Sequence, residues 1–121
     1  MKILPIYTSR GDATALVAYP NVYNPVGEWI GFITAGREVY SVLGYYVGYL
    51  TEDRRIVRER NPSAPRPHLE APPAPERISP PASVPLAPLL GELTYSTVDV
   101  LLEEPERLHT LDVGELREDM D

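Results

Sequence analysis

The first sixty residues repeat a short pattern, and this internal repeat limits the chain to a small set of folds. A β-branched residue followed by tyrosine occurs three times, and a weaker fourth copy follows; the spacings are 16, 17 and 17 residues. A glycine stands four positions after each tyrosine, and asparagine takes that position in the fourth copy. A regular period is the signature of folds built from similar supersecondary units. The four copies are Ile6-Tyr7 with Gly11, Val22-Tyr23 with Gly27, Val39-Tyr40 with Gly44, and Ile56-Val57 with Asn61.

Each unit predicts two short strands joined by a tight turn. Val, Ile, Tyr, Trp and Phe fill the arms, and these residues suit a pleated, half-buried surface. Glycine supplies the left-handed backbone that short hairpin loops require, and we expect Asn61 to adopt it in the fourth unit. The pattern therefore predicts an all-β meander of four tandem hairpins, arranged as a sheet, a barrel or a propeller-like ring. The second arms are residues 13–17, 29–33 and 46–50.

Both alternating faces of these arms are apolar. A sheet with one face in water carries polar residues at every second position, and the arms lack that alternation. We therefore expect both faces of the sheet to be at least partly covered. A column of small residues predicts close approach of backbones or aromatic rings at those points. The column consists of Ala15, Gly31 and Gly48.

The repeat resembles the units of the bacterial 4-fold β flower proteins, small domains of four tandem (I/V)-Y-x-x-x-G-x-x-x-G-(F/Y/W) units that often continue into a proline-rich tail. The resemblance covers residues 4–62 and implies an approximately four-fold arrangement of β-hairpins; it implies no activity. The fourth unit departs from the pattern, because Val57 replaces tyrosine and Pro62 and Pro65 disable its second arm. The matching residues are Ile6, Tyr7, Gly11, Val22, Tyr23, Gly27, Gly31, Phe32, Val39, Tyr40, Gly44, Gly48 and Tyr49.

Proline divides the rest of the chain. Ten of the 14 prolines lie between Pro62 and Pro88, and this density favours an extended, solvated polyproline II spacer. The chain thus divides into a β-hairpin domain (1–61), a proline-rich linker (62–91) and an acidic C-terminal segment (92–121). Within the linker, residues 84–90 are more apolar and are candidates to dock on a surface.

The C-terminal segment is predicted to complete the fourth unit. Residues 92–97 alternate and suit a strand, whereas a helix capped by Ser96 or Thr97 is the competing interpretation. A short helical turn beginning at Pro105 follows, and the end from Gly114 onward is expected to fray. The spacer is long enough to return to its own chain or to reach a neighbouring one. Because exchange between chains would stabilise a small core, we expect a homo-oligomer, most commonly a dimer.

Composition excludes several chemistries. The chain has no cysteine and only two histidines, His68 and His109, so we expect no metal site and no cofactor. No serine stands in a nucleophile-elbow context, and we expect no enzyme activity. Residues 92–121 carry ten acidic and two basic side chains within a net charge of −7, which argues against binding to nucleic acid. No apolar run is long enough to cross a membrane, and we expect a cytoplasmic protein without a membrane partner.

Two features are candidates for a functional surface. Trp29, Tyr45, Tyr46 and Tyr49 either fill the small core or form a surface that stacks on sugars, bases or a partner's side chains. A run of arginines between residues 54 and 60 either protects an edge strand or pairs with the acidic tail. We therefore expect a non-enzymatic structural or protein-interaction module that binds itself or a further protein. The alternative is a small-ligand or glycan-binding domain that uses the surface aromatics.

Overall fold

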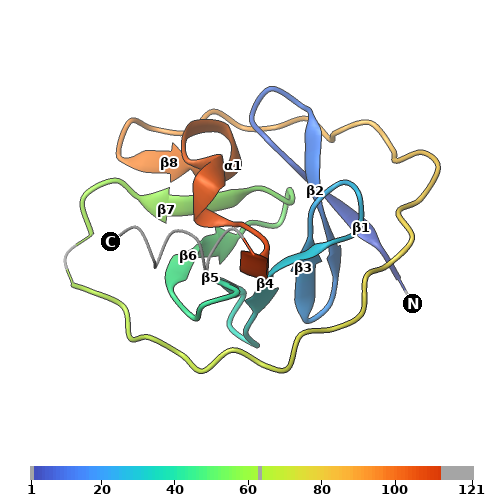
Figure 1. Ribbon diagram of the computed structural model, residues 1–121. Helices are drawn as coiled ribbons and strands as arrows, with labels where there is room; N and C mark the ends of the chain where they lie inside the picture. The colour runs from blue at the N-terminus through green and yellow to red at the C-terminus, as the bar shows by residue number, and fades with distance from the viewer. Residues whose placement is uncertain (1, 63, 113–121) are drawn as a thin grey trace.

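A computed structural model describes residues 2–62 and 64–112, and in this part of the chain eight strands form one antiparallel sheet (Figure 1). Each strand pairs with the next strand along the chain, and the sheet curls into a half-barrel. The all-β class that the sequence predicts is confirmed. The strands are β1 (Leu4–Tyr7), β2 (Ala13–Ala18), β3 (Asn21–Tyr23), β4 (Trp29–Ile33), β5 (Glu38–Ser41), β6 (Tyr46–Leu50), β7 (Ile56–Glu59) and β8 (Thr97–Asp99); a helical turn α1 (Val100–Glu103) and a 3-10 turn η1 (Pro105–Arg107) follow.

The hairpins β1–β2, β3–β4 and β5–β6 pair in the same way. In each of them a buried aliphatic residue lies opposite a small residue of the partner strand. The register shifts immediately afterwards, because the tyrosine that follows the aliphatic residue pairs with the residue two positions before the small one. A β-bulge of this kind bends its strand and increases the local twist, which favours the curl of the sheet. The opposed pairs are Ile6 with Ala15, Val22 with Gly31, and Val39 with Gly48.

Five of the loops between strands share one hydrogen-bond pattern, seen in the loop from Ser41 to Tyr45. Ser41 N donates to Tyr45 O over 2.8 Å, and Gly44 N donates to Ser41 O over 2.9 Å. The fourth residue of each of these loops has a positive φ. The sequence predicts this conformation for the three glycines, but it does not predict it for the two arginines that take the same position in the other two loops. Asn61 is not among the residues with positive φ, so that prediction is wrong. The five residues are Gly11 (φ 89°), Gly27 (90°), Arg37 (65°), Gly44 (88°) and Arg54 (66°).

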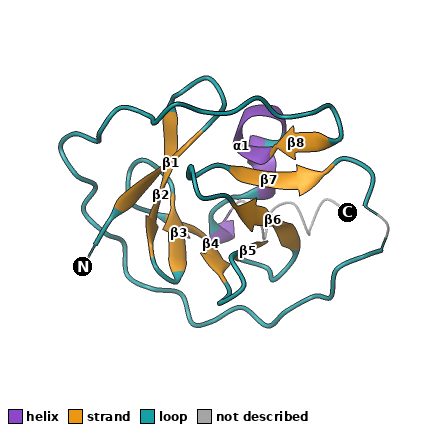
Figure 2. Ribbon diagram, turned by 180° about the vertical axis from the view of Figure 1, so that it is seen from behind, coloured by secondary structure: helices purple, strands orange, loops and turns teal. Residues whose placement is uncertain are grey.

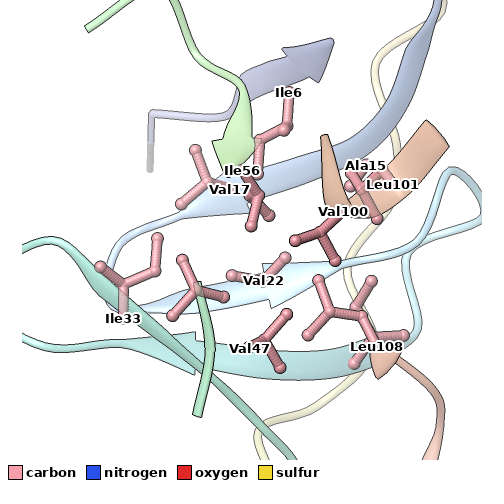
Figure 3. Close-up of a cluster of buried hydrophobic side chains, with 12 residues drawn as sticks. Ile6, Ala15, Val17, Val22, Ile33, Val47, Ile56, Val100, Leu101 and Leu108 are labelled. Atoms are coloured by element: carbon pink, nitrogen blue, oxygen red, sulfur yellow. The ribbon is translucent and has the colours of Figure 1, made fainter. Parts of the chain in front are cut away.

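The inner face of the sheet holds the larger apolar core. The first residue of each repeated pair is fully buried there. Helical turn α1, and Leu108 directly after η1, bring further apolar side chains into the hollow of the half-barrel (Figure 3). A Cβ atom at Gly31 would lie 2.5 Å from Tyr40 O, and one at Gly48 would lie 2.4 Å from Val57 O. The predicted close approach at the small-residue column is therefore confirmed. The core includes Ile6, Val22, Val39, Ile56, Val100, Leu101 and Leu108.

A distant segment of the same chain pairs with β7. Strand β8 lies antiparallel to it, with Val98 opposite Arg58, so no hairpin loop forms at Asn61. The predicted strand over residues 92–97 is placed too early, because Thr97 N donates to Thr94 O over 3.0 Å and the chain turns there before it enters the sheet. The competing helix capped by Ser96 or Thr97 is also wrong, since α1 begins at Val100. The turn beginning at Pro105 is confirmed, and the fraying expected from Gly114 lies outside the described residues.

A polar cluster joins the first loop to the last strand. Ser9 donates through both its backbone N and its Oγ to Asp99 Oδ2, each over 2.6 Å. The buried Arg55 donates to Ser9 Oγ over 2.9 Å and to Asp53 Oδ2 over 2.8 Å. Burial opposes ionisation of Asp53, but hydrogen bonds from Arg55 and Thr51 hold the pKa of its carboxyl below the ordinary value. These contacts fasten the two ends of the half-barrel to each other.

The proline-rich segment forms a belt around the sheet. Residues 64–91, here called the belt, contain no helix or strand and run along the rim of the molecule (Figures 1 and 2). Leu69, Ala71 and Ile78 pack against the apolar cluster on the outer face, so both faces of the sheet are covered, as predicted. Most residues of the belt are exposed, in keeping with an extended, solvated spacer, and the segment contacts the sheet at intervals along its length. The outer cluster consists of Leu16, Ala18, Tyr23, Trp29, Phe32, Tyr40 and Val42.

The belt contacts three hairpin loops at intervals of nine residues. Leu69 N donates to Gly44 O over 2.9 Å, and Ile78 N donates to Gly27 O over 3.0 Å. Ala87, the next residue at that spacing, lies against Gly11. A Cβ atom added to this glycine would lie 3.9 Å from the Cβ of Ala87. A Cβ at Gly44 or Gly27 would lie 1.8 or 1.9 Å from the belt carbonyl. Those two positions therefore require glycine both for their φ and for the approach of the belt.

Candidate functional site

Three of the four predicted site residues line one cleft. Tyr45 ends the loop before β6, while Tyr46 and Tyr49 lie within that strand. The cleft has a volume of about 460 Å³, which is in the range of small-ligand sites. We call it the tyrosine cleft. Its other walls come from β7, from Pro62 and residues 64–66, and from η1. They consist of Arg58, Glu59, Pro62, Ala64, Pro65, Arg66 and Arg107.

Trp29, the fourth predicted residue, lies apart from the cleft. Its side chain is 7% exposed and belongs to the apolar cluster on the outer face of the sheet. The large indole is buried there beside Phe32 and Tyr40. In this position Trp29 contributes to packing and is not available to stack on a ligand.

The belt supplies side chains that hold the tyrosines in place. The guanidinium of Arg66 lies over the Tyr46 ring, 4.6 Å from its centroid, and the Tyr40 ring meets the same tyrosine edge-on at 5.6 Å. Burial raises the pKa of the Tyr46 hydroxyl above its ordinary value. The His68 ring lies 4.8 Å from the Tyr45 ring. Tyr45 and Tyr49 nevertheless remain 56% and 43% exposed, and both are open to a ligand.

The arginines around the cleft are already paired with carboxylates. Arg58 donates to both oxygens of Glu104, over 2.6 and 2.8 Å, and Arg107 Nε lies 2.9 Å from the same carboxylate. The hydrogen bond from Arg58 lowers the pKa of Glu104 from 4.5 to about 2. Arg66 is hydrogen-bonded to Glu38. Because each guanidinium holds a carboxylate, the cleft suits an uncharged ligand better than an anion.

Two arginines of the run between residues 54 and 60 pair with the acidic C-terminal segment, which is the second of the two predicted roles. Arg58 pairs with Glu104, and Arg60 lies 3.3 Å from Glu103 while its guanidinium stacks on Tyr95. The acidic C-terminal segment therefore neutralises part of the run within the chain.

Both histidine rings in the described part of the chain lie against backbone carbonyl oxygens. His68 Nε2 lies 2.6 Å from Leu43 O, and His109 Nδ1 lies 3.0 Å from Thr110 O, so neither ring contacts a serine or a carboxylate there. Within the same ranges, no group of three or more His, Cys, Asp or Glu side chains could hold a metal ion. No helix in the described part of the chain is long and apolar enough to cross a membrane.

The sequence does not predict the part of the cleft wall that comes from the proline-rich segment. Pro62, Pro65 and Arg66 lie in that segment, and their residue types do not distinguish a cleft wall from a spacer. The signal that could have revealed the belt is the spacing of Leu69, Ile78 and Ala87, which are nine residues apart in a proline-rich context.

Comparisons with models of protein families, with curated proteins and with solved structures gave no match to this chain.

Proposed function

We propose that the chain is a non-enzymatic structural or protein-interaction module that associates with further copies of itself. The observation that carries this proposal is the exposure of two leucines on the belt. Leu86 is 95% exposed and Leu89 is 100% exposed. Large apolar side chains gathered on a surface typically mark a site of protein interaction. They lie on a segment that is held in place, since Tyr7 Oη donates to Pro85 O over 2.7 Å.

The proposal includes a four-unit arrangement of hairpins like that of the 4-fold β flower proteins. It is supported by the common register and bulge of the first three hairpins and by the equivalent buried residues Ile6, Val22, Val39 and Ile56. In this arrangement β7 and β8 are the fourth unit, whose second arm comes from the C-terminal segment. The rigid sheet then serves as a scaffold that presents the belt.

The proposed function is tested by the mass of the full chain in solution. Light scattering coupled to size exclusion is measured from micromolar to millimolar concentration. We expect the mass to rise above the 13.5 kDa of one chain as concentration rises. A constant mass of one chain over the whole range would contradict self-association.

The alternative function is binding of a small ligand or a glycan in the tyrosine cleft. The cleft volume and the exposed rings of Tyr45 and Tyr49 favour it, because sugars stack on aromatic rings. It predicts that neutral oligosaccharides shift the NMR resonances of these two tyrosines. Matched Tyr49→Ala and Tyr19→Ala variants would then separate cleft binding from stacking on any exposed tyrosine, since Tyr19 is 68% exposed and lies elsewhere.

A further inference from the structure

The two exposed leucines form one edge of an uncharged segment. Residues 84–90 read Val-Pro-Leu-Ala-Pro-Leu-Leu. Proline fixes its own φ and moves the preceding residue into extended conformations, so this sequence favours a polyproline II helix with three residues per turn. Residues three apart then share one side. Leu86 and Leu89, here called the leucine ridge, therefore point the same way, while the half-buried Ala87 faces the sheet at Gly11.

The tyrosine cleft has the chemistry that binds such a ridge. Aromatic-lined grooves recognise polyproline II segments, whose fixed conformation loses little entropy on binding. Tyr45 and Tyr49 offer exposed rings, and Pro62 and Pro65 add apolar wall. The guanidinium groups at the cleft already hold carboxylates, which matches a ligand without charge.

Charged side chains border both the ridge and the cleft. Glu52 and Arg54 line the surface beside Leu86, and neither makes an ion pair within the described residues. At the cleft, the side chains of Arg66 and Arg107 are 50% and 42% exposed. These basic side chains can meet an acidic neighbour of the ridge without giving up their present partners.

Within one chain the ridge does not reach the cleft. The ridge is held at β1 by the bond from Tyr7 to Pro85 O, whereas the cleft lies at β6, β7, Pro62 and residues 64–66. The two parts of the belt lie on opposite sides of the molecule (Figure 1). A ridge that enters a cleft must therefore come from another molecule.

We propose that the leucine ridge of one copy of this chain occupies the tyrosine cleft of a second copy. This inference rests on the proposed self-association and names its interface. The contact joins two different surfaces, so an open assembly keeps one free ridge at one end and one free cleft at the other. The assembly is then either an open filament or a closed ring, and the smallest closed form is a two-fold dimer in which each ridge occupies the partner's cleft.

The test uses two double variants of the full chain that each remove one side of the contact. The ridge variant carries Leu86→Ser and Leu89→Ser, and the cleft variant carries Tyr45→Ser and Tyr49→Ser. We expect each variant alone to have the mass of one chain and to lose at least tenfold in association. Mixed in equal amounts, they should form a complex of two chains and nothing larger, because the intact cleft of one binds the intact ridge of the other. Tyr19→Ser, at an exposed tyrosine outside both surfaces, should assemble like the unmodified chain.

The outcomes of these measurements distinguish a failure of the ridge–cleft contact from a failure of the proposed self-association. If the unmodified chain assembles and both variants assemble equally well, the ridge–cleft contact is wrong while self-association stands. If both variants are single chains but the mixture forms no two-chain complex, the contact is likewise wrong. If the unmodified chain never assembles, both proposals fail. A synthetic peptide of residues 83–91 gives a measurement that does not depend on the folding of a variant: it should reduce the mass of the assembled chain, and a version with serine at both leucine positions should not.

Discussion

A single glycine in a hairpin loop meets two separate requirements at Gly44. Its φ of 88° lies in the left-handed region, and a Cβ there would lie 1.8 Å from Leu69 O. The loop and the belt therefore depend on the same missing side chain. Gly36 is a suitable control, because its φ lies outside the left-handed region and a Cβ would have no contact closer than 3.9 Å.

We predict that Gly44→Ala lowers the free energy of unfolding by about 2 kcal/mol or more, from left-handed strain and the loss of the hydrogen bond to Leu69 N. Gly36→Ala should change it by less than about 0.5 kcal/mol. Urea denaturation of both variants measures the difference. Equal effects of the two substitutions would mean that neither the loop conformation nor the belt contact at Gly44 matters.

At the residue scale, the sequence predicts the left-handed loop conformation where the residue is glycine, and it does not predict it where another residue takes that position. Gly11, Gly27 and Gly44 could be assigned to left-handed positions because glycine is favoured there. Arg37 and Arg54 take the same conformation, which their residue type does not signal. Their loops share another feature with the glycine loops: the first residue is Thr, Ser or Asn, and its side chain accepts a bond from a loop amide, as Thr51 Oγ1 does from Arg55 N over 3.0 Å.

At the scale of elements, one ion pair fastens the C-terminal helical turn to the last strand of the repeat. Arg58 lies in β7, and Glu104 follows α1. The hydrogen bond from Arg58 lowers the pKa of Glu104 from 4.5 to about 2. A group with a lowered pKa in the folded state stabilises the fold above its unfolded pKa, and this stability is lost as the pH falls through the folded pKa.

We predict that the unmodified chain loses more stability between pH 4.5 and pH 2 than a Glu104→Gln variant does. The difference should be no more than about 1 kcal/mol, because water screens a pair this close to the surface. Thermal melts across that range measure it, with Glu76→Gln on the exposed belt as the control. If the two curves stay parallel down to pH 2, the pair with Arg58 does not hold the helical turn.

The strands that pair with their neighbours along the chain were predictable from the sequence. Strand β8, which pairs with β7 from a distant part of the chain, was only partly predictable. Residues 13–17, 29–33 and 46–50 each pair with a neighbour along the chain, so their own pattern of apolar residues is sufficient. Strand β8 pairs with β7 across an intervening stretch that includes the belt, and its exact residues depend on where the turn at Thr94 ends. The residues around Tyr95 alternate as a strand does, but Tyr95 instead lies exposed under Arg60.

At the scale of the whole molecule, residues 64–112 complete the domain. They supply β8 for the edge of β7, the side chains Val100 and Leu108 for the inner core, and Leu69 and Ile78 for the outer face. A fragment of residues 1–61 would expose an edge strand and both apolar faces. We predict that this fragment aggregates or melts without a cooperative transition. A monodisperse fragment that melts at the temperature of the full chain would contradict this account.

The tyrosine cleft also depends on the whole molecule, because its walls come from β6 and β7, from the belt and from η1. The sequence could identify Tyr45, Tyr46 and Tyr49 as candidates, because aromatic residues gather around that arm. It could not separate them from Trp29, whose burial depends on its packing in the outer cluster. The position of the belt is thus the physical reason why fold and site were only partly predictable.

Amide hydrogen exchange measured by NMR tests most directly whether the belt is part of the fold. Leu69 N and Ile78 N donate to the loop carbonyls of Gly44 and Gly27, whereas Glu70 and Glu76 are exposed belt residues whose amides serve as the comparison. We predict that the first two amides exchange at least tenfold more slowly than the other two. Exchange of all four amides at the rate of an unstructured peptide would contradict the account, because the belt would then be a free chain.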